Sequence, residues 1–173
     1  MTFEDHLQEL HRLFAEAPVT RFVGQELRVC RDGTAEVALP FREELLQGLG
    51  VVHGGFVTFV ADTAGWFAVA SLGHARLATA QLGLNFTAPV RSEELLATAR
   101  VLSAGKRLAV CELRVTTRSG TLVGAGQATY AILVRGRSEP PPGAGEFESA
   151  QADTADRAEE ILGETGFGEP KSG

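Results

Sequence analysis

The sequence predicts an α+β fold, in which a long antiparallel β-sheet wraps around one apolar α-helix. Residues 54–72 (GGFVTFVADTAGWFAVASL) are apolar on nearly all sides, which is typical of a helix buried at the centre of a fold. Four runs rich in Val, Leu and Thr follow this segment and show little helical periodicity. The tight connections 104–106 and 118–120 join the last three runs and favour an antiparallel meander.

Apolar side chains near the N-terminus recur at helical spacing and predict a short amphipathic helix over residues 3–16. Its apolar face consists of Phe3, Leu7, Leu10 and Phe14. Two strands are then predicted over 21–30 and 34–39, joined by a turn at 31–33. Residues 40–52 are expected to be irregular, with one helical turn near 42–46.

The four runs after the apolar helix are predicted strands over residues 77–87, 94–103, 107–117 and 121–134. Gly124 and Gly126, two apart in the last run, would let that strand bend or pack closely on the helix. A sheet of this kind has a second face, which commonly packs against another copy of the protein.

The chain of 173 residues is long enough for one domain of ordinary size and too short for two. We expect the domain to span 1–135, because a cluster of Pro and Gly follows it and few large apolar residues lie beyond. The remaining residues, 136–173, hold nine acids and three bases and therefore carry the whole net charge of −6. They are predicted to be a flexible acidic tail, in which 149–162 could form a short helix.

Charge and composition exclude several classes of function. A neutral body with an acidic tail offers no attraction for a phosphate backbone, so nucleic-acid binding is not expected. The apolar runs are too interrupted to span a membrane, and the N-terminus (MTFEDHLQELHRLF) is unlike a secretory signal, so we expect a soluble cytoplasmic protein with no membrane partner. Cys30 and Cys111 are too few for a disulfide framework and the four histidines are scattered, which predicts buried thiols and no metal site.

Asp62 is the first candidate for chemistry, because it interrupts the most apolar segment of the chain. A carboxylate on a buried helix costs free energy unless it is paired or hydrogen-bonded, and it adds nothing to packing. At the start of the same helix, His53, Gly54 and Gly55 would present N–H groups that suit a developing oxyanion. A structural cap or salt bridge for Asp62, and a plain tight turn at the glycines, are the alternatives.

The spacing of these two features predicts a dimer. Gly55 and Asp62 are seven residues apart, which is about 10.5 Å along a helix. One acyl carbon cannot easily reach both an oxyanion donor and a carboxylate across that gap. Two helices packed antiparallel across a two-fold axis would bring Gly55 of one subunit to Asp62 of the other, so we expect a homodimer with two composite sites.

The stretch Gln47–Gly55 (QGLGVVHGG), followed by Asp62, resembles the signature of hotdog-fold acyl-CoA thioesterases of the phenylacetate-degradation (PaaI-like) type. The run 79–89 (TAQLGLNFTAP) resembles the next strand of that family, and the resemblance covers roughly 20–134. It implies a hotdog fold and hydrolysis of a small aryl or medium-chain acyl-CoA to free acid and CoA, with no separate cofactor. We expect a homodimer at least, with a homotetramer as the larger alternative.

The resemblance implies a role for each matching residue. The Gly55 N–H would be the oxyanion donor, and Asp62 of the partner subunit would be the nucleophile or the base that activates water. Gln47 stands where the family often has Asn, and would orient the carbonyl or the water. Thr79 would help to hold the water beside the acid, and His53 would fix the loop by hydrogen bonding.

Substrate contacts are expected around these residues. The predicted acyl pocket is lined by Gly54, Phe56, Phe59, Trp66 and Phe86. The phosphates of CoA would need basic residues near strand ends, for which the candidates are Arg91, Lys106 and Arg107. Each of these residues also has an ordinary role open to it, in the core or on the solvated surface.

Two other functions stay open. An acyl-thioester dehydratase or hydratase would share the fold but pair an essential histidine with an acid in a different arrangement. A non-catalytic acyl-CoA sensor would bind the same ligand without turnover, although binding an apolar chain has no use for a buried carboxylate such as Asp62.

Overall fold

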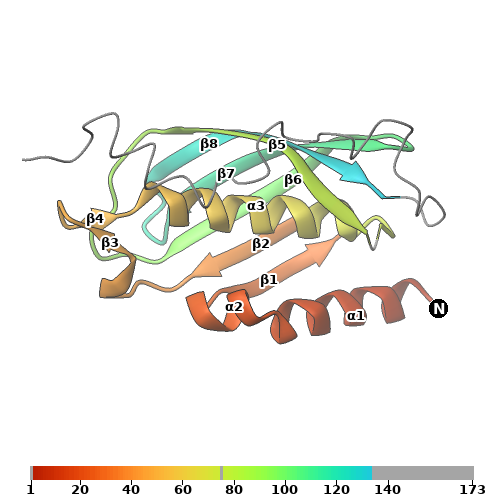
Figure 1. The fold of residues 1–173 in the computed structure, drawn as a ribbon, viewed down its shortest axis with the longest axis horizontal. Helices are drawn as coiled ribbons and strands as arrows, with labels where there is room; N and C mark the ends of the chain where they lie inside the picture. The colour runs from red at the N-terminus through yellow and green to blue at the C-terminus, as the bar shows by residue number, and fades with distance from the viewer. Residues whose placement is uncertain (1, 75, 134–173) are drawn as a thin grey trace, which may run out of the picture. The chain divides into compact units, whose positions relative to one another are not determined.

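The structure, a computed structural model, describes residues 2–74 and 76–133. They form a six-stranded antiparallel sheet with one long helix against it, which confirms the predicted α+β class (Figure 1). In spatial order the strands are β1 (Glu26–Arg31), β2 (Thr34–Leu39), β6 (Leu95–Ala104), β7 (Leu108–Thr117), β8 (Leu122–Ile132) and β5 (Leu77–Phe86). The tail predicted over 136–173 lies outside the described residues, and the domain boundary at 135 stays a prediction.

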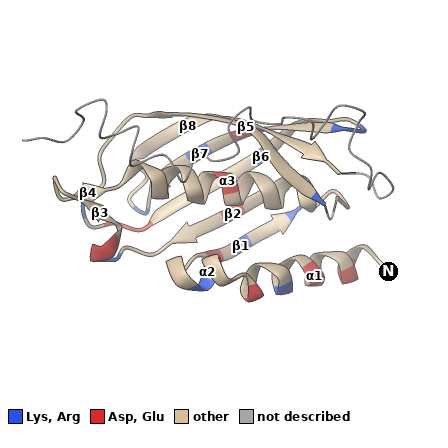
Figure 2. Cartoon of the chain, in the orientation of Figure 1, with Lys and Arg blue, Asp and Glu red and all other residues tan. Residues whose placement is uncertain are grey.

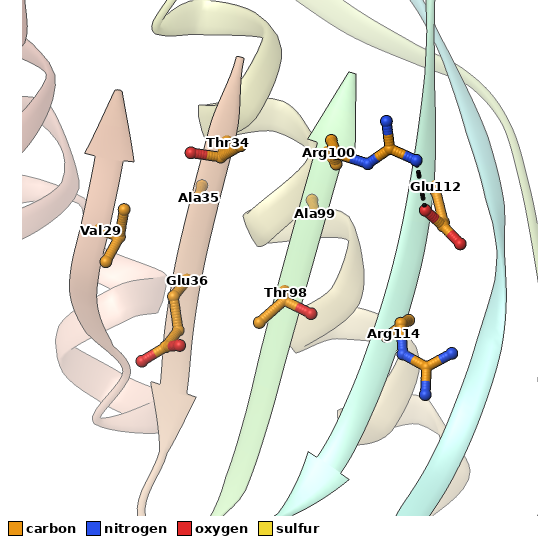
Figure 3. A pocket seen from close by; sticks show the side chains of 9 residues that line it. All are labelled: Val29, Thr34, Ala35, Glu36, Thr98, Ala99, Arg100, Glu112 and Arg114. Carbon is orange, nitrogen blue, oxygen red and sulfur yellow. Dashed lines mark hydrogen bonds and ion pairs between the residues drawn. The ribbon is translucent and has the colours of Figure 1, made fainter. Parts of the chain in front are cut away.

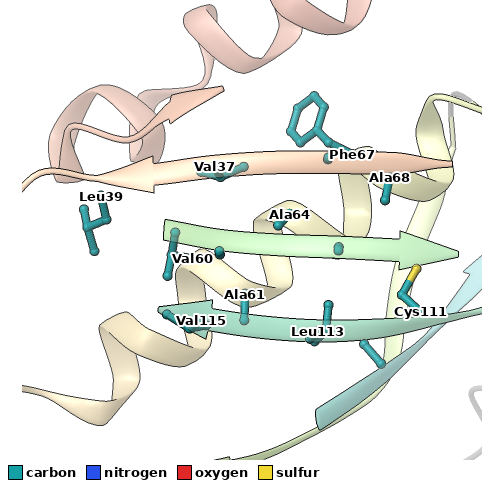
Figure 4. Close-up of a cluster of buried hydrophobic side chains, with 14 of the residues drawn as sticks. Val37, Leu39, Val60, Ala61, Ala64, Phe67, Ala68, Cys111, Leu113 and Val115 are labelled. Atoms are coloured by element: carbon teal, nitrogen blue, oxygen red, sulfur yellow. The ribbon is translucent and has the colours of Figure 1, made fainter. Parts of the chain in front are cut away.

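The long helix, α3 (Gly54–Ala70), is the predicted central helix and packs on one face of the sheet. Val60, Ala61 and Ala64 are fully buried, and Ala61 lies beside Leu113 and Val115 of β7 (Figure 4). Short alanine side chains let the helix approach the sheet closely, so few voids remain between them. No helix in the described part of the chain is long and apolar enough to cross a membrane.

The first helix, α1 (Phe3–Glu16), confirms the prediction over 3–16, and it begins with Thr2 and Asp5 capping each other's backbone N–H groups. Leu10 and Phe14 are buried as expected, but Phe3 is half exposed. His6 is buried on this face where Phe3 was expected to be. Its Nε2 lies 2.8 Å from the carbonyl oxygen of Ala70. His6 therefore adds a second partner to a carbonyl at the end of α3 that also accepts from the Gly73 N–H at 3.0 Å.

The prediction of a strand over 21–30 is wrong in its first part. Residues 18–23 form a short helix, α2 (Pro18–Val23), and β1 begins only at Glu26. Pro18 stands at the first helical position, where its missing N–H costs nothing, and Gly24 ends the helix in the left-handed conformation (φ 78°). Both signals are visible in the sequence, but the strand-like run Arg21–Val23 led to the prediction of a strand.

The turn predicted at 31–33 is present, with Asp32 and Gly33 both at positive φ, as a two-residue hairpin loop of type I′ requires. The 3-10 turn η1 (Glu43–Leu45) matches the helical turn expected near 42–46. The small hairpin of β3 (Leu46–Gln47) and β4 (Val51–Val52) was not predicted, because two-residue strands show no periodicity.

Gly124 and Gly126 allow close packing of β8, but against β5 and not against the helix. A Cβ atom on Gly126 would overlap the carbonyl of Gly83, and one on Gly124 would lie 3.1 Å from the Leu84 side chain. The two glycines therefore keep the edge strand β5 close to its neighbour.

The face of the sheet opposite α3 is polar and charged. Glu36, Arg100, Glu112 and Arg114 surround a hollow of about 350 Å³ there, and Arg100 and Glu112 form an ion pair at 3.1 Å (Figure 3). Charged side chains of both signs thus lie on this face, and the second copy expected to cover it stays a prediction.

Candidate active site

Asp62 lies halfway along α3 and is the only charged residue of that helix (Figure 2). Its Oδ1 accepts a hydrogen bond from Thr79 Oγ1 of β5 at 3.0 Å and one from the Tyr130 hydroxyl of β8 at 3.1 Å. No cation pairs with Asp62 among residues 2–74 and 76–133. Two hydroxyl donors therefore hold this half-buried carboxylate, with no salt bridge to it in the described chain.

Tyr130 is a residue that the sequence reasoning missed. Its side chain is fully buried, and its hydroxyl also lies 3.0 Å from the backbone carbonyl oxygen of Asp62. Burial, and then the neighbouring carboxylate of Asp62, raise the pKa of Tyr130 far above its ordinary value. The hydroxyl therefore stays protonated at neutral pH and is a permanent donor. The available signal was that Tyr130 is the only tyrosine of the chain and sits in an apolar strand.

The N-terminus of α3 is capped by His53, whose Nδ1 accepts a hydrogen bond from the Gly55 N–H at 2.9 Å. A Cβ atom on Gly55 would lie 2.9 Å from that nitrogen, so glycine lets the ring approach. Phe86 packs over Gly54 in a similar way, 3.2 Å from where a Cβ would be. The loop contact expected of His53 is present, and it engages the same N–H that we assigned to the oxyanion.

An apolar hollow of about 340 Å³ adjoins this helix end. Its walls come from α2 and α3 and consist of Val19, Phe22, Val23, His53, Gly55, Phe56 and Phe59. The structure thus brings the predicted residues Phe56 and Phe59 together with Gly55 and His53. The three residues of α2 were not expected there, because their segment was predicted to be a strand.

Other predicted site residues lie apart from the hollow. Gln47 Oε1 accepts from the Leu49 N–H at 2.9 Å, within the turn between β3 and β4. Trp66 lies three turns along α3 from Gly55, and its indole N–H donates to the Leu77 carbonyl at 3.3 Å. In one chain, Trp66 therefore anchors the start of β5 and does not line the hollow beside Gly55.

The three candidate phosphate contacts are also separated. Arg91 lies close to the start of α3, where its Nη1 is 3.4 Å from the Gly50 carbonyl oxygen. Lys106 and Arg107 are exposed in the turn between β6 and β7, at the opposite end of the sheet (Figure 1). One chain therefore does not bring all three cations to the same place.

The two cysteines are buried, and burial raises the pKa of both the Cys30 and Cys111 thiols to about 11. Since the thiolate is the reactive form, neither is suited to nucleophilic attack at neutral pH. Within the described ranges no group of three or more His, Cys, Asp or Glu side chains could hold a metal ion.

Comparison with known proteins places these residues in a family. The family model of the thioesterase superfamily matches residues 49–124, a range that includes His53, Gly55, Asp62 and Thr79. A Halobacterium salinarum protein named "Putative esterase" is 34% identical over 125 residues, which are 65% of this chain and 82% of that protein. The acyl-coenzyme A thioesterase PaaI of Escherichia coli is 29% identical over 132 residues, 76% of this chain and 88% of PaaI.

Solved structures agree on the fold. The structure of E. coli PaaI, from the phenylacetic acid degradation operon, superposes with a TM-score of 0.71 and 20% identity, over 78% of this chain and 97% of that one. A hypothetical thioesterase of Streptococcus pneumoniae, solved with coenzyme A, superposes with a TM-score of 0.65 and 22% identity, over 70% and 95% of the two chains. The sheet and its long helix form the hotdog thioesterase fold. With this fold, and with a relative at 34% identity, the chain belongs to the thioesterase superfamily.

Proposed function

We propose that this protein is an acyl-CoA thioesterase, which hydrolyses an acyl-CoA to a free acid and CoA. The observation that carries the proposal is the carboxylate of Asp62, alone on an apolar helix and held by hydrogen bonds from Thr79 and Tyr130. A helix in a core gains no stability from such a group, which is a reason to assign it to chemistry. Membership of the thioesterase superfamily and the relative solved with coenzyme A support the substrate class.

The chemistry needs few groups, because a thioester carbonyl is already electrophilic. As a general base, Asp62 takes a proton from water while the water oxygen bonds to the carbonyl carbon and negative charge moves to the carbonyl oxygen. Collapse of this intermediate breaks the C–S bond, and the CoA thiolate takes up the proton. As a nucleophile, Asp62 would instead bond to the carbonyl carbon and expel the thiolate, and water would hydrolyse the resulting anhydride.

In this proposal the oxyanion binds at the N-terminus of α3, where N–H groups and the helix dipole favour negative charge. The Gly55 N–H is the donor, and His53 Nδ1 now accepts its hydrogen bond. Binding of the thioester therefore requires the His53 ring to turn away or to share this N–H.

A second copy of the chain completes the proposed site. Gly55 and Asp62 are about 10.5 Å apart along α3, too far to act on one carbon. The edge strand β5 is ten residues long and has no charged side chain and no proline, the usual protections of an exposed edge. Pairing of β5 with its copy would continue the sheet and set the two α3 helices antiparallel. The homotetramer stays a prediction.

The hollow beside Gly55 is the proposed site of the acyl group. A carbonyl bound at the Gly55 N–H has its acyl substituent next to walls formed largely by valine and phenylalanine. A closed apolar cavity of about 150 Å³ is enough for benzene, so about 340 Å³ suits an aryl or medium-chain acyl group. Arg91 is the candidate for CoA phosphate in the same chain, whereas Lys106 and Arg107 would reach it only from the second copy. A role in phenylacetate degradation and a cytoplasmic location stay predictions.

The test measures thiol release from phenylacetyl-, hydroxybenzoyl-, hexanoyl- and palmitoyl-CoA by the wild type and the Asp62→Asn variant. We expect at least one substrate to be hydrolysed and the variant to lose at least about a hundredfold in kcat, because the amide neither accepts the proton of water nor attacks carbon well. The melting temperature should be kept or raised, since a charge leaves the core.

Glu112→Gln is the matched control, because it makes the same change on the charged outer face and should keep full activity. An Asp62→Asn variant as active as the wild type would overturn the mechanism. Binding of acyl-CoA without hydrolysis by the wild type would overturn the thioesterase assignment in favour of a sensor.

A further inference from the structure

We propose that Tyr130 positions the reacting carboxylate, so that Asp62 is held through Oδ1 and Oδ2 is the oxygen that meets the water or the thioester carbon. This inference rests on the proposed function, in which Asp62 reacts. It assigns a task to a residue outside 49–124, the range that the family model matches.

Both hydrogen-bond donors converge on the same oxygen of the carboxylate. Thr79 approaches Oδ1 from β5 at 3.0 Å and Tyr130 approaches it from β8 at 3.1 Å. No donor reaches Oδ2 from the described part of the chain. An oxygen with two donors has its lone pairs engaged, so the other oxygen keeps the electron pair that can take a proton or attack carbon. Two donors from different strands also fix the rotation of the carboxylate.

The hydroxyl of Tyr130 is not needed for packing. The ring is fully buried, and a phenylalanine would fill the same space without burying a polar group that must find a partner. Its one proton is shared between the carbonyl oxygen at 3.0 Å and Oδ1 at 3.1 Å, and both acceptors belong to Asp62. As a donor, the Tyr130 hydroxyl therefore interacts with Asp62 alone.

Gly65 provides the space for that hydroxyl. It lies one turn beyond Asp62 on α3, and a Cβ atom there would overlap the Tyr130 hydroxyl and come within 2.8 Å of Tyr130 Cζ. The missing side chain at Gly65, three residues after Asp62, therefore leaves room for the Tyr130 hydroxyl to reach the carboxylate. A substitution at Gly65 should therefore displace the Tyr130 hydroxyl while leaving Tyr130 and Asp62 themselves unchanged.

Few other ionisable groups face this cluster. Strand β5 has no titratable side chain and β8 has only Tyr130. On β7, Cys111 faces the helix, with its Sγ 3.7 Å from the Gly65 carbonyl oxygen, whereas Glu112 and Arg114 lie on the outer face (Figure 3). Within one chain, Thr79 and Tyr130 are therefore the side chains that donate to the carboxylate.

The experiment compares Tyr130→Phe with the wild type on the best acyl-CoA substrate at pH 7. We expect kcat to fall about tenfold, which is the effect of one lost hydrogen bond to a charged group, with KM unchanged within about twofold. Thr79→Val, on an exposed side chain, should lower kcat in the same way without disturbing the core.

Cys111→Ala is the control, because it removes a buried group beside Gly65 and leaves both donors in place; its kcat and KM should match those of the wild type. Gly65→Ala should lower kcat like Tyr130→Phe, and the double variant should lose less than the product of the two effects, since both act through one hydroxyl. A Tyr130→Phe variant with wild-type kcat would overturn this inference and leave the proposed function standing. A wild type that hydrolyses no acyl-CoA would overturn both.

Discussion

Phe22 is exposed to 78%, an unusual position for a large apolar side chain, and it lines the hollow beside Gly55. If the acyl group occupies that hollow, truncation of Phe22 removes part of one wall. We expect Phe22→Ala to lower kcat/KM for phenylacetyl- and hexanoyl-CoA by about five- to tenfold, and to leave acetyl-CoA nearly unchanged, because a short acyl group does not reach α2.

The comparison is a panel of initial rates with acyl chains of two, six and sixteen carbons and with phenylacetyl-CoA. Leu13→Ala is the matched control, because Leu13 is an exposed apolar residue of α1 and does not line the hollow. Equal losses of kcat/KM on every substrate would contradict a role of Phe22 in acyl selection.

Single residues also show how far sequence reasoning reaches at this site. Asp62 could be singled out because a charge within an apolar helix is visible without coordinates, and the resemblance added Thr79. Tyr130 could not be found in this way, since its contact with Asp62 joins residues 68 apart in the sequence. The cap between His53 and Gly55 depends on a ring rotamer, which no spacing rule supplies.

The edge strand β5 is the element through which we expect the dimer to form. We expect the paired substitutions Gln81→Lys and Asn85→Lys, both on exposed positions, to weaken the dimer, because lysines on an edge strand oppose pairing with a second copy. Activity should fall with the dimer, since each site takes Gly55 from one copy and Asp62 from the other. Sedimentation velocity and thiol release, measured on the same samples over a range of protein concentration, provide the check.

Gln127→Lys adds a positive charge at an exposed position of the neighbouring strand β8 and is the control for charge alone. It should leave both the sedimentation coefficient and the rate unchanged. A paired-lysine variant that is monomeric and fully active would contradict the composite site.

Elements differ in how well the sequence predicts them. The long strands and α3 have patterns that extend over ten or more residues, and their predicted bounds agree with the structure to within about three residues. The short α2 was predicted as a strand, because Arg21–Val23 looks extended when the signals of Pro18 and Gly24 are not given weight. Short elements depend on such terminal residues more than on periodicity.

For the molecule as a whole, the buried thiols predict a loss of stability in alkali. Burial raises the pKa of Cys30 and Cys111 to about 11, whereas an unfolded thiol ionises near about 8.5. Between these values the folded chain binds more protons than the unfolded chain, so the free energy of unfolding falls as the pH rises. Below about pH 8.5 both thiols are protonated in the folded and the unfolded chain, so their full contribution to the free energy of unfolding is present.

Urea unfolding at pH 8.0, 9.5 and 10.5 measures this effect. We expect the midpoint to fall with pH for the wild type, and to fall less steeply for the double variant Cys30→Ala, Cys111→Ala, in which other groups still titrate. At pH 8 the native protein should also resist an aromatic disulfide reagent that labels both thiols in denaturant. Rapid labelling of the native protein at pH 8 would contradict the burial of these groups.

The three residues of the Asp62 cluster come from α3, β5 and β8, and the two hydrogen bonds close loops of 17 and 68 residues. Such long loops close late, because their chain entropy is lost before the contacts between strands compensate for it. During refolding from denaturant, helical circular dichroism should therefore return first and hydrolytic activity last. Because the proposed site also needs a second copy, recovered turnover would report the last step of folding and assembly together.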